Sequence, residues 1–316
     1  MEITFLGTSS GVPTRGRNVS AVALRLPQRA ESWLFDCGEG TQHQLLRSPL
    51  NISQFTRIFI THMHGDHVYG LMGLLSTAGL SGRPQGIDIY GPSGLADYIR
   101  AGCRYSYTGF NFPFEVHEVR DGEVVFEDEE FVVSCRLLKH RVPAYGYLVV
   151  EKDRPGRFNV ERAAASGIPS GPLYGRLKRG ERITLPDGRE FDGADFCEPP
   201  EEGRRVAYCT DTMYTANSVE LARGADVLIH EATFGEEEAA LAVQSMHSTA
   251  TDAARVAAEA GVKTLVLTHF SARYVAGNSL TTEDLLREAC AVFPATRLAH
   301  DFLTVEVPRR RESAEA

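Results

Sequence analysis

Three histidines and an aspartate fall within six consecutive residues, and this crowding constrains the fold more than any other feature of the chain. The cluster lies in the stretch Thr61-His62-Met63-His64-Gly65-Asp66-His67. So many ionisable groups are too polar for a core, and a metal ion is the partner that brings imidazoles and a carboxylate together. His62 and His64 project to the same side of an extended chain, and Gly65 permits a bend that returns Asp66 and His67 toward them. One segment can therefore supply ligands to two ions.

The cluster follows a short apolar run, Arg57-Ile58-Phe59-Ile60, which predicts a buried strand. It therefore lies on the loop at the carboxyl end of a strand, where α/β sheets usually build their sites. A His-x-His-x-Asp-His pattern after a strand resembles the signature of the metallo-β-lactamase superfamily of binuclear metallohydrolases. That resemblance implies an α/β fold of the αββα sandwich type.

Three later residues, His140, Asp211 and His269, match the metal-ligand pattern of this superfamily, and each follows an apolar run. Alone, either histidine is more often an ordinary core or loop residue than a ligand. Two ions, however, need more ligands than one loop supplies, and an aspartate can bridge both. The resemblance implies two zinc ions per chain, with manganese or another divalent ion as the alternative. It assigns His62, His64 and His140 to one ion and Asp66, His67 and His269 to the other, with Asp211 bridging.

Length and composition agree with a single enzyme domain spanning residues 1–316, of which 43% are hydrophobic. No apolar stretch approaches the roughly 20 residues of a membrane span, so we expect no membrane partner and a cytoplasmic location. The six cysteines are scattered without a Cys-x-x-Cys pair, which indicates reduced packing residues. A net charge of −9 argues mildly against a nucleic-acid partner, but that count omits two divalent ions.

The apolar periodicity predicts strands and helices in the order of an αββα sandwich. Strands are expected near residues 3–6, 21–26, 33–36, 57–60, 87–90, 131–138, 205–209, 227–230 and 264–267. Helices are expected near residues 68–80, 95–105, 249–260 and 282–293.

Residues 152–190 break this pattern, because glycines and prolines interrupt the chain and apolar periodicity fades. We interpret this segment as an inserted flexible arm. Its nine basic and five acidic residues give a net charge of +4 and leave −13 for the rest of the chain. A solvated lid or disordered linker is one interpretation. The alternative is a basic arm that grips a phosphate backbone, with Arg176, Lys178 and Arg179 among its contacts.

The arm narrows the resemblance to the ribonuclease Z family, the tRNA 3′-processing endonucleases, in their short form. Arg15, Arg17 and Asn18 match the family's Pro-x-Lys-x-Arg-Asn loop, with arginine where lysine is frequent. The resemblance implies precursor tRNA as the partner, a homodimer, and products with a 3′ hydroxyl on the tRNA and a 5′ phosphate on the trailer. The resemblance also implies that Asp66 accepts a proton during the cleavage reaction. His247, held by Glu231, is our candidate for protonating the leaving oxygen.

Several alternatives remain open at this point. Arg15 and Arg17 could be ordinary surface charges, and Thr249 with Asp252 could form a capping box that makes Ser248 and Thr249 structural. Three other histidines fit no ligand spacing and are interpreted as structural: His43, His117 and His300. As a whole, the chain could instead be a hydrolase of this fold that acts on a small ester, or a binding protein that has lost catalysis.

Overall fold

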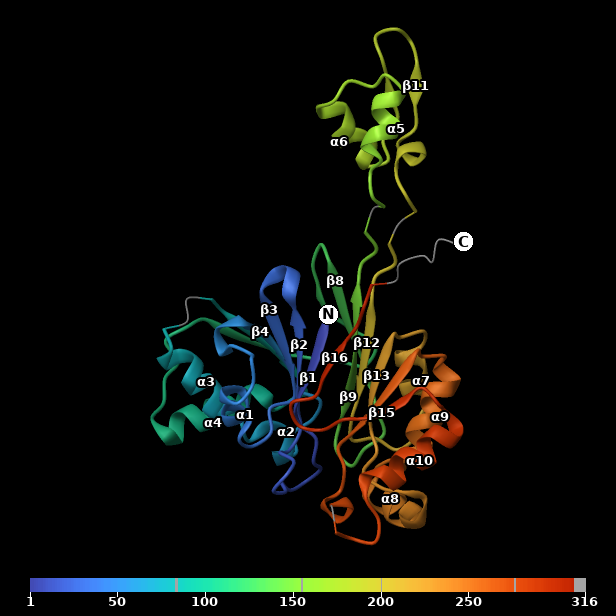
Figure 1. Ribbon diagram of the computed structural model, residues 1–316. Helices are drawn as coiled ribbons and strands as arrows, with labels where there is room; N and C mark the ends of the chain where they lie inside the picture. The colour runs from blue at the N-terminus through green and yellow to red at the C-terminus, as the bar shows by residue number, and fades with distance from the viewer. Residues whose placement is uncertain (83–84, 155, 200, 276, 310–316) are drawn as a thin grey trace. The chain divides into compact units, whose positions relative to one another are not determined.

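The chain forms two units, which are described separately below. Unit 1 comprises Met1–Val150 and Arg205–Val307, and unit 2 comprises Glu151–Arg204 and the residues from Pro308 onward. The computed structural model describes residues 1–82, 85–154, 156–199, 201–275 and 277–309 (Figure 1). Within those residues, no helix is both long and apolar enough to cross a membrane.

Two seven-stranded sheets form the centre of unit 1. The first sheet has the strand order β16 (Thr304–Glu306), β1 (Glu2–Gly7), β2 (Ala21–Leu26), β3 (Glu31–Phe35), β4 (Phe55–Phe59), β5 (Ile87–Gly91) and β6 (Phe114–Glu118). The second has the order β15 (Thr296–Leu298), β14 (Thr264–Thr268), β13 (Val227–Glu231), β12 (Arg205–Cys209), β9 (Tyr145–Glu151), β8 (Phe131–Leu137) and β7 (Val124–Glu127). Strands β3 to β6 are parallel, as are β12 to β15. Parallel strands end at one edge of a sheet, so the loops that follow them share that edge.

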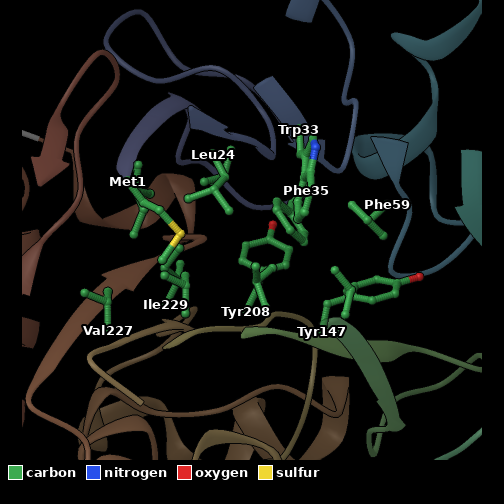
Figure 2. Close-up of a cluster of buried hydrophobic side chains, with 14 of the residues drawn as sticks. Met1, Leu24, Trp33, Phe35, Phe59, Tyr147, Tyr208, Val227 and Ile229 are labelled. Atoms are coloured by element: carbon green, nitrogen blue, oxygen red, sulfur yellow. The ribbon is translucent and has the colours of Figure 1, made fainter. Parts of the chain in front are cut away.

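The two sheets pack face to face through a core of large side chains (Figure 2). Trp33 of β3 meets Phe131 of β8 with ring centroids 5.3 Å apart. Phe59 of β4 lies 5.3 Å from Tyr147 of β9 by the same measure. Each large side chain buried in this way contributes about 1.5–3 kcal/mol relative to an exposed one. This core fixes the position of one sheet relative to the other, and therefore the positions of the loops at the ends of their strands.

Helices cover the outer face of each sheet (Figure 1). The first sheet carries α1 (Thr41–Leu46), α2 (Gly65–Val68), α3 (Leu71–Leu80) and α4 (Leu95–Ser106). The second carries α7 (Ala216–Ala222), α9 (Ala250–Ala260) and α10 (Thr282–Val292), and α8 (Ala239–Ser245) precedes α9. This arrangement explains why β3 and β13 are buried along their whole length, since both faces of each strand are covered. The predicted αββα sandwich is confirmed.

One predicted helix is broken. The sequence predicts a single helix over residues 68–80, but α2 ends at Val68 and α3 begins at Leu71. Gly70 lies between them, and a Cβ atom there would stand 2.0 Å from the carbonyl oxygen of Gly38. This close approach of two loops, which only glycine allows, redirects the chain after residues 62–67. The prediction also missed β9 and the short strands β6, β7, β15 and β16.

Unit 2 is a folded module and extends beyond the predicted boundary at residue 190. In the stem, residues 151–154 and 156–159 run beside residues 201–204 and 196–199, with backbone hydrogen bonds between Arg154 and Glu201 of 3.0 Å in both directions. Beyond the stem, the head contains α5 (Val160–Ala165), α6 (Pro172–Lys178), β10 (Ile183–Thr184) and β11 (Glu190–Phe191). Its core consists of buried side chains from Ala163, Ile168, Leu177, Ile183, Leu185 and Phe196. Because these come from several short elements, they leave no periodic signal in the sequence.

The net charge of unit 2 differs from that of the shorter segment 152–190. Over the whole of residues 151–204 there are ten basic and eleven acidic residues, so the net charge is −1. The net charge of +4 holds for residues 152–190, to which the prediction referred. Extending the segment to residues 151–204 adds six carboxylates and one arginine, so the excess of positive charge is confined to the shorter segment. Exposed cations gather instead around the end of α6, in the head.

Candidate metal centre

All seven predicted metal ligands lie together in unit 1: five are on loops that follow strands, and Asp66 and His67 are in the short helix α2. His62 to His67 follow β4, His140 follows β8, Asp211 follows β12 and His269 follows β14. Apart from His64 and Asp66, the ligands are buried or nearly so, including His62 and His67, which are fully inaccessible. The sequence placed each ligand at a strand end, and the two packed sheets bring those ends together.

The ligand atoms form two groups that share Asp211. In one group, the ligand atoms of His62, His64, His140 and Asp211 all lie within 4.8 Å of one another, and in the other so do those of Asp66, His67, Asp211 and His269. The Oδ2 atom of Asp211 is 3.5 Å from His62 Nε2 and 3.8 Å from His140 Nε2. Its Oδ1 atom is 3.1 Å from the Nε2 atoms of both His67 and His269. Each carboxylate oxygen thus faces one group, which is the geometry of a bridging ligand.

The electrostatics of this cluster suit divalent cations. Burial lowers the pKa values of His62, His64 and His140, so these imidazoles are neutral and their ring nitrogens can donate to a metal. Burial also lowers the pKa of His67, but the carboxylates of Asp211, Asp36 and Asp66 outweigh it and raise that pKa well above its usual range. The carboxylates therefore favour a positive charge at this point, which a bound metal ion would also supply. A set of nitrogen and oxygen donors of this kind fits divalent metal binding.

Hydrogen bonds to the outer ring nitrogens orient four of the histidines. His67 Nδ1 donates to Asp36 Oδ2 at 2.8 Å, and His140 Nδ1 donates to the Met246 carbonyl at 2.9 Å. The hydroxyl oxygens of Thr61 and Thr233 lie 2.9 Å from the Nδ1 atoms of His62 and His269. Bonding through Nδ1 fixes the tautomer that leaves Nε2 facing the cluster. The imidazoles are thus held in position for ligation.

Asp36 is a site residue that the sequence analysis missed. Its side chain is fully buried at the end of β3 and accepts hydrogen bonds from the Thr61 backbone at 2.8 Å and the Tyr208 hydroxyl at 3.0 Å, besides the bond from His67. It therefore ties together strands from both sheets behind the metal ligands. Its position in the sequence could have indicated it, because Asp36 is a charged residue directly after an apolar run that predicts a strand.

Three residues of the centre adopt the left-handed backbone region, with φ of 57° at Asp36, 51° at Asp211 and 60° at His269. Such conformations are uncommon for residues other than glycine and cluster at functional sites. Each of these residues directly follows or lies near the end of a strand, where the turn aims its side chain into the cluster. Directing these three side chains into the cluster therefore costs backbone strain.

His247 and Glu231 form a second, connected feature beside the metal ligands. Glu231 is fully buried and accepts from His247 Nδ1 at 2.8 Å, the Thr212 backbone at 2.7 Å and the Thr233 hydroxyl at 2.6 Å. The His247 ring lies 4.9 Å from that of His140 and 5.5 Å from that of His269. Burial lowers the pKa of His247, but Glu231 outweighs burial and raises that pKa to about 9. A protonated imidazole is thereby held at the rim of the cluster.

The neighbouring residues of this motif have structural contacts. The Thr249 side chain accepts from the Asp252 backbone at 3.1 Å, and the Asp252 carboxylate accepts from the Thr249 backbone at 3.2 Å. This capping box begins α9, as the sequence suggested as an alternative. The Ser248 backbone donates to Glu231 at 3.1 Å. Ser248 and Thr249 therefore fix the position from which His247 reaches the site.

The loop of residues 8–18 closes one side of the centre, and two of its three predicted substrate-binding residues hold it in place. The Gly11 backbone donates to Asp66 Oδ2 at 2.7 Å, which joins this loop to the ligand segment. The Arg17 guanidinium lies over the Phe270 ring and donates to the Ala299 carbonyl at 2.8 Å. Asn18 donates to the Glu39 carbonyl at 2.7 Å. Arg15 is exposed and is the member of the three best placed to meet a ligand from solvent.

The three predicted contacts of the insertion lie at the end of α6 in unit 2, where all are exposed. Arg176 and Arg179 each donate to Glu181 at 2.8 Å. Among the histidines that the sequence set aside, His43 is exposed on α1 and His300 is exposed in a turn. His117 has a neighbour that the sequence did not suggest, because its Nε2 atom lies 3.6 Å from Asp88 Oδ1 on the adjacent strand.

Comparisons with known proteins place the chain among related families. A family model described as a β-lactamase superfamily domain matches residues 198–270, and one described as the anti-Pycsar protein Apyc1 matches residues 1–151. The two segments together contain all seven ligands. Each match covers less than half of the chain.

Full-length relatives identify the family. The chain is 65% identical to ribonuclease Z of Microcystis aeruginosa over 312 residues, which cover 99% of this chain and 98% of that protein. It is 64% identical to ribonuclease Z of a Synechocystis strain, covering 98% and 95% of the two chains. The crystal structure of the short form of human tRNase Z matches with a TM-score of 0.70 and 34% identity, covering 98% of this chain and 100% of that one. The resemblance inferred from the sequence is confirmed, and the chain belongs to the ribonuclease Z family of enzymes with the metallo-β-lactamase fold.

Proposed function

We propose that the chain is a metal-dependent endoribonuclease that removes the 3′ trailer from precursor tRNA, with two zinc ions held by the candidate metal centre. One observation carries the proposal: Asp211 presents one carboxylate oxygen to each of two ligand groups, and the His247–Glu231 pair stands beside them. The family relationship supports tRNA as the substrate.

The division of ligands follows from the two groups. His62, His64 and His140 would hold one ion, and Asp66, His67 and His269 would hold the other, with Asp211 between them. Two bound ions supply an activated water and neutralise charge on the phosphate that is cleaved. Manganese or another divalent ion also accepts this set of nitrogen and oxygen donors.

The protein's own groups account for the proton transfers. Asp66 lies at the rim of the cluster with its side chain 13% exposed, and its Oδ2 atom is 3.5 Å from the Nε2 atoms of both His67 and His269. A carboxylate in this position can take the proton released when water attacks phosphorus. His247, protonated and held by Glu231, can give a proton to the departing 3′ oxygen of the tRNA. The products are then a tRNA with a 3′ hydroxyl and a trailer with a 5′ phosphate.

The remaining contacts serve to bind RNA. Arg15 is the exposed cation of the loop that joins Asp66, and it suits a phosphate next to the cleaved bond. Arg176, Lys178 and Arg179 in the head of unit 2 suit backbone phosphates elsewhere on the tRNA. The side chains of Arg17 and Asn18 already donate hydrogen bonds to backbone carbonyls that hold their loop in position. Their part in RNA binding is therefore to keep Arg15 in place. A homodimer and a cytoplasmic location remain predictions of the family resemblance, and sedimentation of the purified protein measures the first.

The direct test is to incubate the purified, zinc-loaded protein with precursor tRNA labelled at both ends and to map the new termini. We expect a single cut at the start of the trailer, a 3′ hydroxyl on the tRNA and a 5′ phosphate on the trailer. An RNA of the same composition without the tRNA fold is the control and is expected to be a poor substrate. If the protein hydrolyses a small diester but leaves precursor tRNA intact, the chain is a hydrolase for a different substrate.

A further inference from the structure

A buried carboxylate surrounded by arginines lies at the base of the unit 2 stem. Glu151, the first residue of this unit, has a fully inaccessible side chain. Its Oε2 atom accepts from Arg204 Nε at 2.6 Å, and its Oε1 atom accepts from the terminal nitrogen of Arg204 at 3.1 Å. Arg154 lies 3.4 Å away. Burial raises the pKa of Glu151, but these arginines outweigh burial and lower it, so the carboxylate is charged.

The C-terminal segment adds a further arginine to this group. Arg309 donates to the same Oε1 atom of Glu151, and it lies 3.3 Å from Glu201. Its side chain is 24% exposed, so the bond is largely shielded from water. Val307, two residues earlier, is hydrogen-bonded to Met1 in the first sheet of unit 1. We call the group formed by Glu151, Arg204 and Arg309 the clasp.

The stem needs such support. Its two segments are joined by isolated bridges at Arg154–Glu201 and Phe158–Cys197, and even a regular pair of strands is marginally stable in water without further packing. The two strands are in close contact at the clasp, because a Cβ atom at Gly203 would lie 1.7 Å from the Glu151 carbonyl oxygen. The Glu151 backbone donates to the Arg204 carbonyl at 2.8 Å. The ion pair between Glu151 and Arg204 therefore holds the two segments of the stem together at its base.

We propose that Glu151 and Arg309 are positioning residues for RNA binding: the C-terminal segment closes the clasp, and the closed clasp keeps the stem paired so that the head presents its cations to precursor tRNA in one arrangement. A binding surface that is already ordered loses less conformational entropy on association. The inference rests on the proposed function, since it assumes that the head contacts RNA. It assigns the C-terminal segment a role that is separate from catalysis.

The test compares the KM and kcat values for precursor tRNA among clasp variants of the metal-loaded protein. We expect Arg309→Ala to raise KM about tenfold with kcat within a factor of two, because one shielded partner of the carboxylate is lost. Hydrolysis of bis-nitrophenyl phosphate should be unchanged. Arg309→Lys, which keeps the charge, should recover part of the loss.

The variant Glu151→Gln distinguishes an effect of the clasp on RNA binding from an effect of net charge. Removing a negative charge from an RNA-binding unit should tighten RNA binding if only long-range charge matters. The clasp instead predicts weaker binding, because the arginines lose their common partner. A KM below the wild-type value would overturn the proposal.

A deletion of residues 310–316 is the matched control. It removes two arginines and two glutamates, so the net charge is unchanged and the clasp remains. We expect wild-type KM for this variant. An increase as large as that of Arg309→Ala would show that the tail itself contacts RNA, and the clasp would then have no separate role.

Amide hydrogen exchange distinguishes failure of this inference from failure of the proposed function. In Arg309→Ala, the amides of Arg154 and Glu201 should exchange about tenfold faster, while the amides of α5 and α6 in the head keep their protection. Unchanged exchange in the stem would overturn the clasp even if the wild-type enzyme cleaves precursor tRNA. If the stem opens as expected but wild-type protein does not cleave precursor tRNA, then the proposed function has failed and the RNA-binding role fails with it.

Discussion

The metal centre and unit 2 differ in how directly the sequence determines them. At the metal centre, each ligand follows a strand, and the packing of two sheets brings every predicted ligand within one cluster. In unit 2, the predicted flexible arm belongs to a stem and a head with its own core, and the charges of residues 151–204 nearly cancel. The difference teaches that the sequence can predict which strand-end residues lie together, whereas a sum of charges depends on where the segment is taken to end.

The largest effect should come from the residue that both ligand groups share. Asp211→Ala removes the only carboxylate assigned to both ions, so cleavage of precursor tRNA should fall on the order of 10⁴-fold or more, and bound metal should fall with it. Rate measurements and metal analysis on the same preparation test this. His43→Ala, an exposed histidine on α1, is the control and should keep both values. Retained activity in Asp211→Ala would break the assignment of a shared ligand.

Proton donation by His247 should have the next largest effect. His247→Ala should slow the chemical step on precursor tRNA by roughly 10²–10⁴-fold with metal content unchanged. The deficit should shrink on a nitrophenyl diester, whose leaving group needs no proton. Single-turnover rates on the two substrates measure it. Equal losses on both would give His247 a structural role instead.

Replacing the head of unit 2 should affect RNA selectively. A short Gly-Ser linker in place of residues 160–195 leaves the stem and should lower kcat/KM for precursor tRNA about 100-fold, through binding. Each lost phosphate contact should flatten the slope of log affinity against log salt by about one unit. Hydrolysis of the small diester should not change. A headless protein that still cleaves precursor tRNA normally would leave unit 2 without a role in recognition.

The smallest expected effect concerns a residue behind the ligands. Asp36→Asn keeps the size of the side chain but removes the charge that orients His67, so metal affinity should fall about 10–100-fold. Competition with a chelator of known affinity measures the change. At saturating metal, most of the activity should return, because His67 itself is intact. Activity that stays low at saturating metal would contradict a purely orienting role.

The sequence located the central strands because they are covered on both faces and are therefore apolar runs, and the family resemblance supplied the sandwich. The sequence missed β9 and the short edge strands, whose pairing depends on neighbours distant in sequence. Family resemblance suggested His247 and Glu231, which lie together in the structure. It did not suggest Asp36, whose only signal in the sequence is its place after an apolar strand and whose bond to His67 is seen in the structure alone. Likewise, Arg17 matched a substrate-binding motif, and only the structure shows its guanidinium occupied by Phe270 and the Ala299 carbonyl.

The most direct test of the account is the number of divalent ions bound per chain, measured by titrating the metal-free protein with zinc and analysing the product by native mass spectrometry. A centre with Asp211 between two ligand groups predicts two ions per wild-type chain, with weakened binding at both positions in Asp211→Asn. Saturation at a single ion in the wild-type chain, with unaltered affinity in the variant, would contradict the binuclear centre on which the proposed function depends.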